Sequence, residues 1–176
     1  MFSGEAKITA RPLTARDWRI FRDMRILALE SEPGVFFAPL SSALSKSPEE
    51  WQSLVSSPTQ QAFGIFDRGR LVGITAVFTS RDDPSGSTAG LAMSFIMPKY
   101  RGRGLAKLLF DVRLDWVRAR PHFKRVLVSH RESNEASRRA NQRQGFLFRR
   151  RVNRTWPDGE VEDELIYELS IGEDDG

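Results

Sequence analysis

The middle of the chain constrains the fold most, because it joins an apolar segment directly to an amphipathic helix. Residues 91–97, LAMSFIM, form an apolar run that Pro98 closes. Apolar side chains then recur at helical spacing, at Leu105, Leu108, Leu109, Val112 and Trp116. Pro121 stops this helix, and a second short apolar segment follows at 124–130. A strand, a helix and a strand in this order need a crossover connection, so we predict at least one parallel strand pair.

Antiparallel hairpins are predicted on both sides of this unit. Two apolar strands within 61–80 meet at a short turn, residues 67–69, and two more within 146–170 flank a Pro-Asp-Gly turn. The remaining predicted elements are a strand at 7–14, helices at 14–30, 47–57 and 133–145, and a long loop at 31–47. We therefore expect one α/β domain over residues 1–176, with a mixed sheet of six to seven strands flanked by about four helices.

Composition narrows the chemistry. The 176 residues include no cysteine, which excludes disulfides, thiolate metal sites and cysteine nucleophiles, and we expect no metal. The first 14 residues lack the basic start and apolar run of a signal peptide, and no segment has the roughly 18 apolar residues that a membrane span needs. These features predict a cytoplasmic protein without a membrane partner.

Charge is unevenly distributed along the chain. Residues 99–154 carry 17 basic and 4 acidic side chains, whereas residues 155–176 carry 9 acidic and no basic ones. The basic block fits a polyanionic ligand, and the alternative is an arginine-rich surface without a ligand. Nucleic-acid binding through 129–151 is a third interpretation, but the segment contains no recognisable nucleic-acid motif, so we expect no nucleic-acid partner.

The basic block begins at the glycine-rich start of the central helix, KYRGRGLAKLLF at 99–110. The first N–H groups of a helix lack partners and lie at the positive end of its dipole, which suits a phosphate. Gly102 and Gly104 leave room for close approach, while Arg101 and Arg103 supply charge. The alternative is a turn that only brings the helix close to a sheet.

These residues resemble the GNAT superfamily of acyl-CoA-dependent N-acetyltransferases. Arg101, Gly104 and Ala106 match its R/Q-x-x-G-x-G/A signature, and Ile96 and Pro98 match the V-x-P segment that precedes it. Further matches are Asn134, Ser137, Gly145 and Phe146 in the N-x-x-A/S and GF segments, and Ala28, Leu29, Pro33 and Phe36 after the first helix. The resemblance covers nearly the whole chain, and the order of the elements agrees with it.

The resemblance implies acetyl-CoA as cosubstrate. Its pyrophosphate would be held by the main chain of Arg101, Gly102, Arg103, Gly104, Leu105 and Ala106. The pantetheine arm would lie along the main chain of Ser94, Phe95 and Ile96, where an N–H would also polarise the thioester carbonyl. The side chains of Phe95 and Ile96 are expected in the core. Asn134 and Ser137 are expected to contact the cosubstrate, and Asn134 also fits a helix N-cap.

The expected catalytic residues depart from the family pattern. Asn141 stands where most relatives have a tyrosine proposed to protonate the thiolate, and an asparagine can only donate a hydrogen bond. Ser137 or a water could take part of that role. Leu91 and Ser129 stand where many relatives place the glutamate that acts as general base. His130 and Glu132 lie nearby, and His130, on the opposite strand face from Ser129, is the candidate base. A surface or structural histidine is the alternative, and the proton could also leave through water. Attack by an already neutral amine is a further alternative.

The acceptor is expected to be a primary amine that enters between loop 31–47 and hairpin 154–162. Asp158, Glu160 and Glu162 would attract a cationic amine there. The alternative to an enzyme is a non-catalytic regulator that binds acetyl-CoA, motivated by the missing tyrosine and glutamate. Dimers are common in the superfamily, so a homodimer is a further expectation of the resemblance.

Overall fold

The computed structural model describes residues 7–172. Residues 1–6 and 173–176 lie outside the described part. They include the start of the 14-residue segment that was assessed for a signal peptide, and the last three acidic residues of the sequence. Among the described residues, no helix is both long and apolar enough to cross a membrane.

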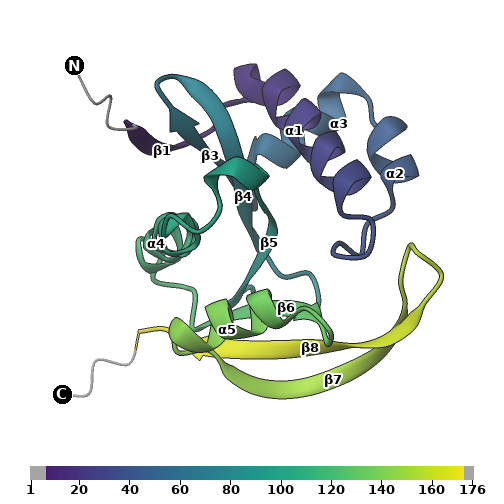
Figure 1. Ribbon diagram of the computed structural model, residues 1–176. Coiled ribbons are helices and arrows are strands. Elements are labelled where there is room, and N and C mark those ends of the chain that lie inside the picture. The colour runs from purple at the N-terminus through teal and green to yellow at the C-terminus, as the bar shows by residue number, and fades with distance from the viewer. Residues whose placement is uncertain (1–6, 173–176) are drawn as a thin grey trace.

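The structure is a mixed sheet with helices on both faces (Figure 1). The strands are β1 Ile8–Pro12, β2 Ser56–Ser57, β3 Gln60–Asp67, β4 Arg70–Thr79, β5 Thr88–Ile96, β6 Arg125–Arg131, β7 Leu147–Thr155 and β8 Val161–Ser170. The α-helices are α1 Trp18–Ser31, α2 Leu40–Leu44, α3 Pro48–Val55, α4 Leu105–Arg118 and α5 Glu135–Arg143. The strand order is β1-β3-β4-β5-β6-β8-β7, with β2 paired to β3. The predicted fold class is confirmed.

The helices divide the core between the two faces of the sheet. Side chains of α1 and α3, such as Phe21 and Trp51, pack on one face, and side chains of α4, such as Phe110 and Leu114, pack on the other. The start of α3 follows the predicted pattern, because the Ser47 hydroxyl accepts from the Glu50 N–H at 3.2 Å and Glu50 caps the Ser47 N–H in return.

The structure has one helix and one strand pairing more than predicted. The predicted loop 31–47 contains α2, a single turn of five residues, and β2 is a two-residue pairing. A helix this short offers no periodic pattern to detect, and its Ser- and Pro-rich composition indicates a loop. The described part of the chain therefore has eight strands and five α-helices, rather than six to seven strands and about four helices.

The parallel pair that the sequence predicts is β5 and β6, and it is short. Only Thr88 to Gly90 pair with Arg125 to Leu127; beyond this point the two strands separate. On its other side β5 contains a bulge against β4, where Met93 has a positive φ of 57° and the Ser94 and Thr75 hydroxyls lie 2.8 Å apart. The sheet is thus open at its centre, between the second halves of β5 and β6.

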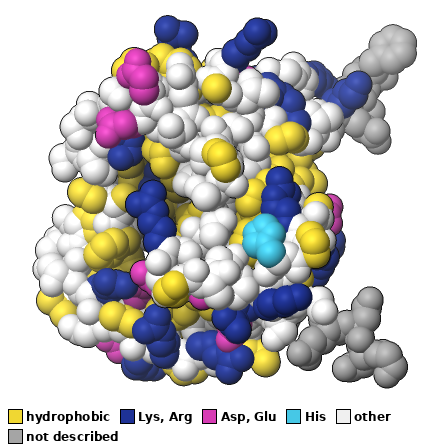
Figure 2. All heavy atoms as spheres, turned by 180° about the vertical axis from the view of Figure 1, so that it is seen from behind, with side chains coloured by type: hydrophobic (Ala, Val, Ile, Leu, Met, Phe, Trp, Pro, Cys, Tyr) yellow, Lys and Arg dark blue, Asp and Glu magenta, His cyan; other side chains and the backbone are white. Residues whose placement is uncertain are grey.

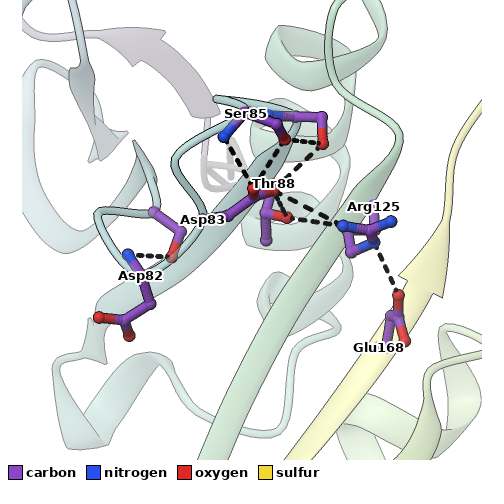
Figure 3. A network of polar contacts seen from close by, with 8 residues as sticks. Asp82, Asp83, Ser85, Thr88, Arg125 and Glu168 are labelled. Atoms are coloured by element: carbon purple, nitrogen blue, oxygen red, sulfur yellow. Dashed lines mark hydrogen bonds and ion pairs between the residues drawn. The ribbon is translucent and has the colours of Figure 1, made fainter.

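A polar network holds the closed end of this strand pair (Figure 3). Asp83, in the turn before β5, accepts hydrogen bonds from the Ser85, Ser87 and Thr88 side chains, and these bonds lower the pKa of its carboxyl group. Arg125 of β6 lies 3.6 Å from Asp83 and 3.2 Å from Glu168 of β8. The network therefore ties the beginning of β5 to β6 and β8.

Candidate active site

A cavity of about 400 Å³ lies where β5 and β6 separate. It is bordered by the loop after α1, by β5, by α4 as far as Arg113, by the end of β6 and by α5. Nine of the predicted site residues line it: Ser94, Phe95, Ile96, Arg101, Ala106, His130, Asn134, Ser137 and Asn141. Leu91 and Ser129, where relatives carry a glutamate, line it as well. Seen from behind in Figure 2, hydrophobic side chains show between the upper and lower halves of this face, and Lys and Arg outnumber Asp and Glu on it.

The N-terminal end of α4 is open, as a phosphate site requires. Gly102 and Gly104 have φ values of 75° and 77°, and apart from each glycine and its chain neighbours no described heavy atom lies within 4 Å of where a Cβ would stand. The N-cap is Gly104 itself, so within the described chain no side chain caps the first N–H groups of α4. Gly102, Arg103, Gly104 and Leu105 do not line the cavity, and the Leu105 side chain is buried in the core. Only the main chain of Leu105 is therefore free to contact a ligand.

Arg101 is not a free positive charge. Its Nη2 lies 2.7 Å from Glu32 at the end of α1, and its Nε donates to the Ile96 carbonyl oxygen at 2.9 Å. The expectation that Arg101 supplies charge to a phosphate is therefore weakened, because a carboxylate already balances it. Arg103 is exposed and lies over the Tyr100 ring at 5.1 Å, and no described carboxylate pairs with it.

The α5 residues face the cavity as the three- and four-residue spacing predicted. Asn134 caps the helix, because its Oδ1 accepts from the Ser137 N–H at 3.2 Å, and both residues also line the cavity. Asn141 is 3 % exposed, and its Nδ2 has no hydrogen-bond partner within residues 7–172. A buried amide donor without a partner is costly, so Asn141 is suited to an acceptor atom supplied by a ligand.

His130 presents one ring nitrogen without a partner. Its Nδ1 lies 2.7 Å from the Arg131 carbonyl oxygen, so Nδ1 carries the proton and Nε2 is left as an acceptor. Nε2 is buried and has no partner among the described residues, and the ring stacks on Tyr167. Burial lowers the pKa of His130, which keeps the imidazole neutral at pH 7. Ser129 is exposed whereas His130 is buried, and both residues line the cavity.

The predicted acidic entrance is partly neutralised, because one arginine pairs with two of its three carboxylates. Arg131 lies 2.7 Å from Asp158 and 2.5 Å from Glu162, and it lowers the pKa of both carboxyl groups. Its Nη1 also donates to the Gly34 carbonyl oxygen at 3.0 Å. Glu160 is exposed, and no described cation pairs with it. Arg131 therefore joins the loop after α1 to the β7–β8 hairpin instead of leaving three free carboxylates there.

Besides Arg131, two further buried arginines border cavities and were not predicted from the sequence. Arg113 of α4 lines the cavity, and Arg25 of α1 lines a neighbouring cavity of about 190 Å³ together with Lys46. Burial lowers the pKa of Arg113 to about 9 and that of Arg25 to about 10. A signal was present for Arg113, because it stands four residues after Leu109 and so falls on the apolar face of the helix. Met93 lines both cavities.

Comparisons with known proteins agree with this arrangement. A family model described as the acetyltransferase (GNAT) family matches residues 22–146. An acetyltransferase of the GNAT family from Streptococcus pneumoniae superposes with a TM-score of 0.78 at 20% identity, covering 94% of this chain and 100% of its own. Spermidine N-acetyltransferase from Vibrio cholerae, in complex with CoA and spermine, has a TM-score of 0.73 at 16% identity, covering 93% and 95%. The protein yncA from Salmonella typhimurium, with its cofactor acetyl-CoA, has a TM-score of 0.73 at 16% identity, covering 96% of both chains.

The solved structures share their fold with this chain over nearly the full length of both. Because the family model also matches more than half of the sequence, the chain belongs to the GNAT acetyltransferase family. No curated protein sequence matches it. Among residues 7–172, no group of three or more His, Asp or Glu side chains is arranged to hold a metal ion.

Proposed function

We propose that the protein is an N-acetyltransferase that transfers the acetyl group of acetyl-CoA to a primary amine by direct attack. The observation that carries the proposal is the cavity between the diverging β5 and β6. It reaches from the first turn of α4 to the neutral imidazole of His130. Solved structures with this fold contain CoA or acetyl-CoA, and the Vibrio cholerae enzyme also contains spermine.

The binding role falls mainly on main-chain atoms. The uncapped N–H groups at the start of α4 are suited to the pyrophosphate, and the open space above Gly102 and Gly104 lets a phosphate approach them. The main chain of residues 94–96 faces the gap, where a pantetheine arm can complete the sheet. The side chain of Phe95 is buried in the core, and that of Ile96 packs against a second core cluster. Neither side chain is therefore needed to contact the pantetheine arm.

Catalysis would rest on positioning and hydrogen bonding rather than on a strong acid. The amine nitrogen attacks the thioester carbonyl carbon, the C–N bond forms, and the C–S bond breaks with the electron pair going to sulfur. His130 Nε2 takes the proton that the nitrogen loses. The unpartnered Asn141 Nδ2, assisted by the Ser137 hydroxyl, stabilises the thiolate, whose ordinary pKa near 8.5 makes it a tolerable leaving group. Holding both reactants in the cavity supplies the larger part of the acceleration.

A non-catalytic acetyl-CoA-binding role is the second candidate. It is favoured by the side chains that line the cavity, because Asn141 cannot act as a general acid and the described lining has neither the tyrosine nor the strand glutamate of most relatives. The two candidates share the same binding site. They differ only in whether the bound acetyl group is transferred to an acceptor.

The first test is calorimetric titration of acetyl-CoA, CoA and 3′-dephospho-CoA into the wild type and Gly104→Glu. We expect the wild type to bind, and Gly104→Glu to bind at least roughly tenfold more weakly, because the new carboxylate fills and repels the phosphate position. Gly86→Glu is the matched control, since Gly86 has a φ of 70° with equally open surroundings but lies in the turn before β5.

A folded wild type that binds none of the three ligands contradicts both candidate functions. Tight binding without acetyl transfer to any member of a broad panel of amines and peptides identifies the non-catalytic role instead. Equal losses in Gly104→Glu and Gly86→Glu would assign the effect to backbone strain and not to phosphate binding.

A further inference from the structure

The cavity contains one positive charge that the described protein does not balance. Arg113 is 3 % exposed and lines the cavity from α4. Its Nε donates to the Leu109 carbonyl oxygen at 2.9 Å, and the guanidinium lies 4.9 Å from the centre of the Phe110 ring. No carboxylate of residues 7–172 pairs with it. Glu32 is the one carboxylate in the described lining, and it is already bound to Arg101.

An unpaired charge in this position is expensive for the folded protein. Burial lowers the pKa of Arg113 to about 9, so the group is still protonated at neutral pH. Buried cations in proteins are normally paired, and an apolar side chain would satisfy the apolar face of α4 at lower cost. The unpaired guanidinium is therefore suited to an anion that arrives with a ligand.

Arg113 lies too far from the expected phosphate position for this anion to be a phosphate of CoA. Arg113 stands nine residues after Gly104, which is about 13 Å along the helix axis from the expected phosphate position. Among the cavity residues are also Leu91 of β5 and Val128 of β6, each next to the last paired residue of its strand. Phe110 and Leu114, on either side of Arg113 in α4, pack in one core cluster with these two residues. Arg113 therefore lies toward the closed end of the gap, beyond the 94–96 main chain that would hold the thioester, where an extended acyl group would reach.

We propose that the cavity takes an acyl-CoA whose acyl group ends in a carboxylate, of the malonyl or succinyl type, and that Arg113 binds that carboxylate. This inference rests on the proposed function and narrows its donor: acetyl-CoA fits as the smaller substrate, and a carboxylated donor of suitable length binds more tightly. The transfer is otherwise unchanged. The amine nitrogen bonds to the thioester carbon, the C–S bond breaks, and CoA leaves as the thiolate. His130 Nε2 takes the amine proton, and the product is an amide with a free carboxylate.

The test compares succinyl-CoA with butyryl-CoA, which has the same number of acyl carbons and no charge, and with CoA itself. Each is titrated into the wild type, Arg113→Met and Arg118→Met. Arg118 is the matched control, because it is an exposed arginine of the same helix that does not line the cavity. We expect the wild type to bind succinyl-CoA at least roughly tenfold more tightly than butyryl-CoA. Arg113→Met should lose this difference and keep its affinity for CoA, and Arg118→Met should resemble the wild type.

Three outcomes overturn the inference. Equal affinities of the wild type for succinyl-CoA and butyryl-CoA show that no carboxylate is recognised. If Arg113→Met binds all three ligands more weakly by the same factor, Arg113 contacts the pantetheine arm and not the acyl carboxylate. Retention of the succinyl preference in Arg113→Met places the recognition elsewhere. If Arg113→Met does not fold, the inference is tested by the wild-type affinities for succinyl-CoA and butyryl-CoA. Arg113→Lys, which keeps the charge, should then keep the preference for succinyl-CoA. Failure of the proposed function is distinct, because then the wild type does not bind CoA either.

Discussion

Arg101, Arg113 and Arg131 belong to the same basic segment of the sequence, but the protein does not balance their charges equally. Arg101 pairs with Glu32, Arg131 pairs with two carboxylates of the β7–β8 hairpin, and Arg113 packs on an aromatic ring without a carboxylate. An arginine offers its charge to a ligand where the protein does not already balance it. Of these three, only Arg113 meets that condition.

At the same scale, His130 predicts a pH dependence of stability. Its pKa in the folded protein lies below the ordinary value of about 6.5, so below that pH the unfolded chain binds a proton that the folded chain does not. The free energy of unfolding should therefore fall as the pH drops through this range. His130→Phe keeps an aromatic ring against Tyr167 and should lose this part of the dependence. Urea unfolding of both proteins at about pH 8 and about pH 5.5 measures it. Parallel losses in the two proteins would refute the assignment.

At the scale of the elements, the turn before β5 determines where the strand pair is closed. Asp83 binds three hydroxyl groups of the next five residues, and Arg125 extends the network to β6 and β8. The network lies at the closed end of the β5–β6 pair, and the cavity lies at the open end. The two ends are stabilised differently, because the closed end relies on polar contacts between strands and the open end on the helices around it.

Replacing Asp83 by Asn should lower the melting temperature by a few degrees, because the amide offers one acceptor oxygen to these donors where the carboxylate offers two. The lowered pKa of Asp83 sets the direction in which stability changes with pH. The stabilisation by the network is present above the ordinary aspartate pKa and is lost as the pH falls toward the lowered pKa. Asp82→Asn is the control, since the Asp82 side chain points away from the network (Figure 3). Thermal melts at neutral and acidic pH test this, and equal effects of the two substitutions would contradict it.

At the scale of the whole molecule, one side chain connects three distant parts of the chain. Arg131 of β6 binds Gly34 in the loop after α1 and two carboxylates of the β7–β8 hairpin, Asp158 and Glu162. On the same side, the Phe37 ring packs edge-on against Trp156 at 5.8 Å. The loop and the hairpin that border the expected acceptor entrance are therefore held together by an ionic contact and an aromatic contact.

Removing Arg131 should loosen this connection without disturbing the rest of the sheet. In Arg131→Met we expect severalfold faster amide hydrogen exchange in residues 34–39 and 155–161, because the carboxylates lose their partner. Exchange in β3 and β4 should stay unchanged. Arg151→Met is the control, since Arg151 forms its ion pairs with Glu132 and Asp163 away from the loop. Unchanged exchange at 34–39 in Arg131→Met would show that the aromatic contact alone is sufficient.

The sequence predicted the elements well where a local pattern encodes them. The apolar spacing of α4, the Ser47 cap of α3 and the glycine turn at residue 69 all depend on neighbours within a few residues. The pairs of Arg131 could not be predicted, because its partners at residues 34, 158 and 162 are brought together only by the folded sheet. Arg113 was missed for another reason: a basic residue on an amphipathic helix is expected at the surface, so its charge outweighed the periodicity in the interpretation.

Met93 separates the two cavities, and its backbone is fixed by the bulge in β5. An unbranched thioether side chain has three rotatable bonds and repacks at low cost. A rotation of this side chain can therefore connect the cavity between β5 and β6 to the neighbouring cavity beside Arg25 and Lys46 while the strand stays in place. Under the proposed function, the size limit for the acyl group would then depend on a side-chain torsion and not on the architecture.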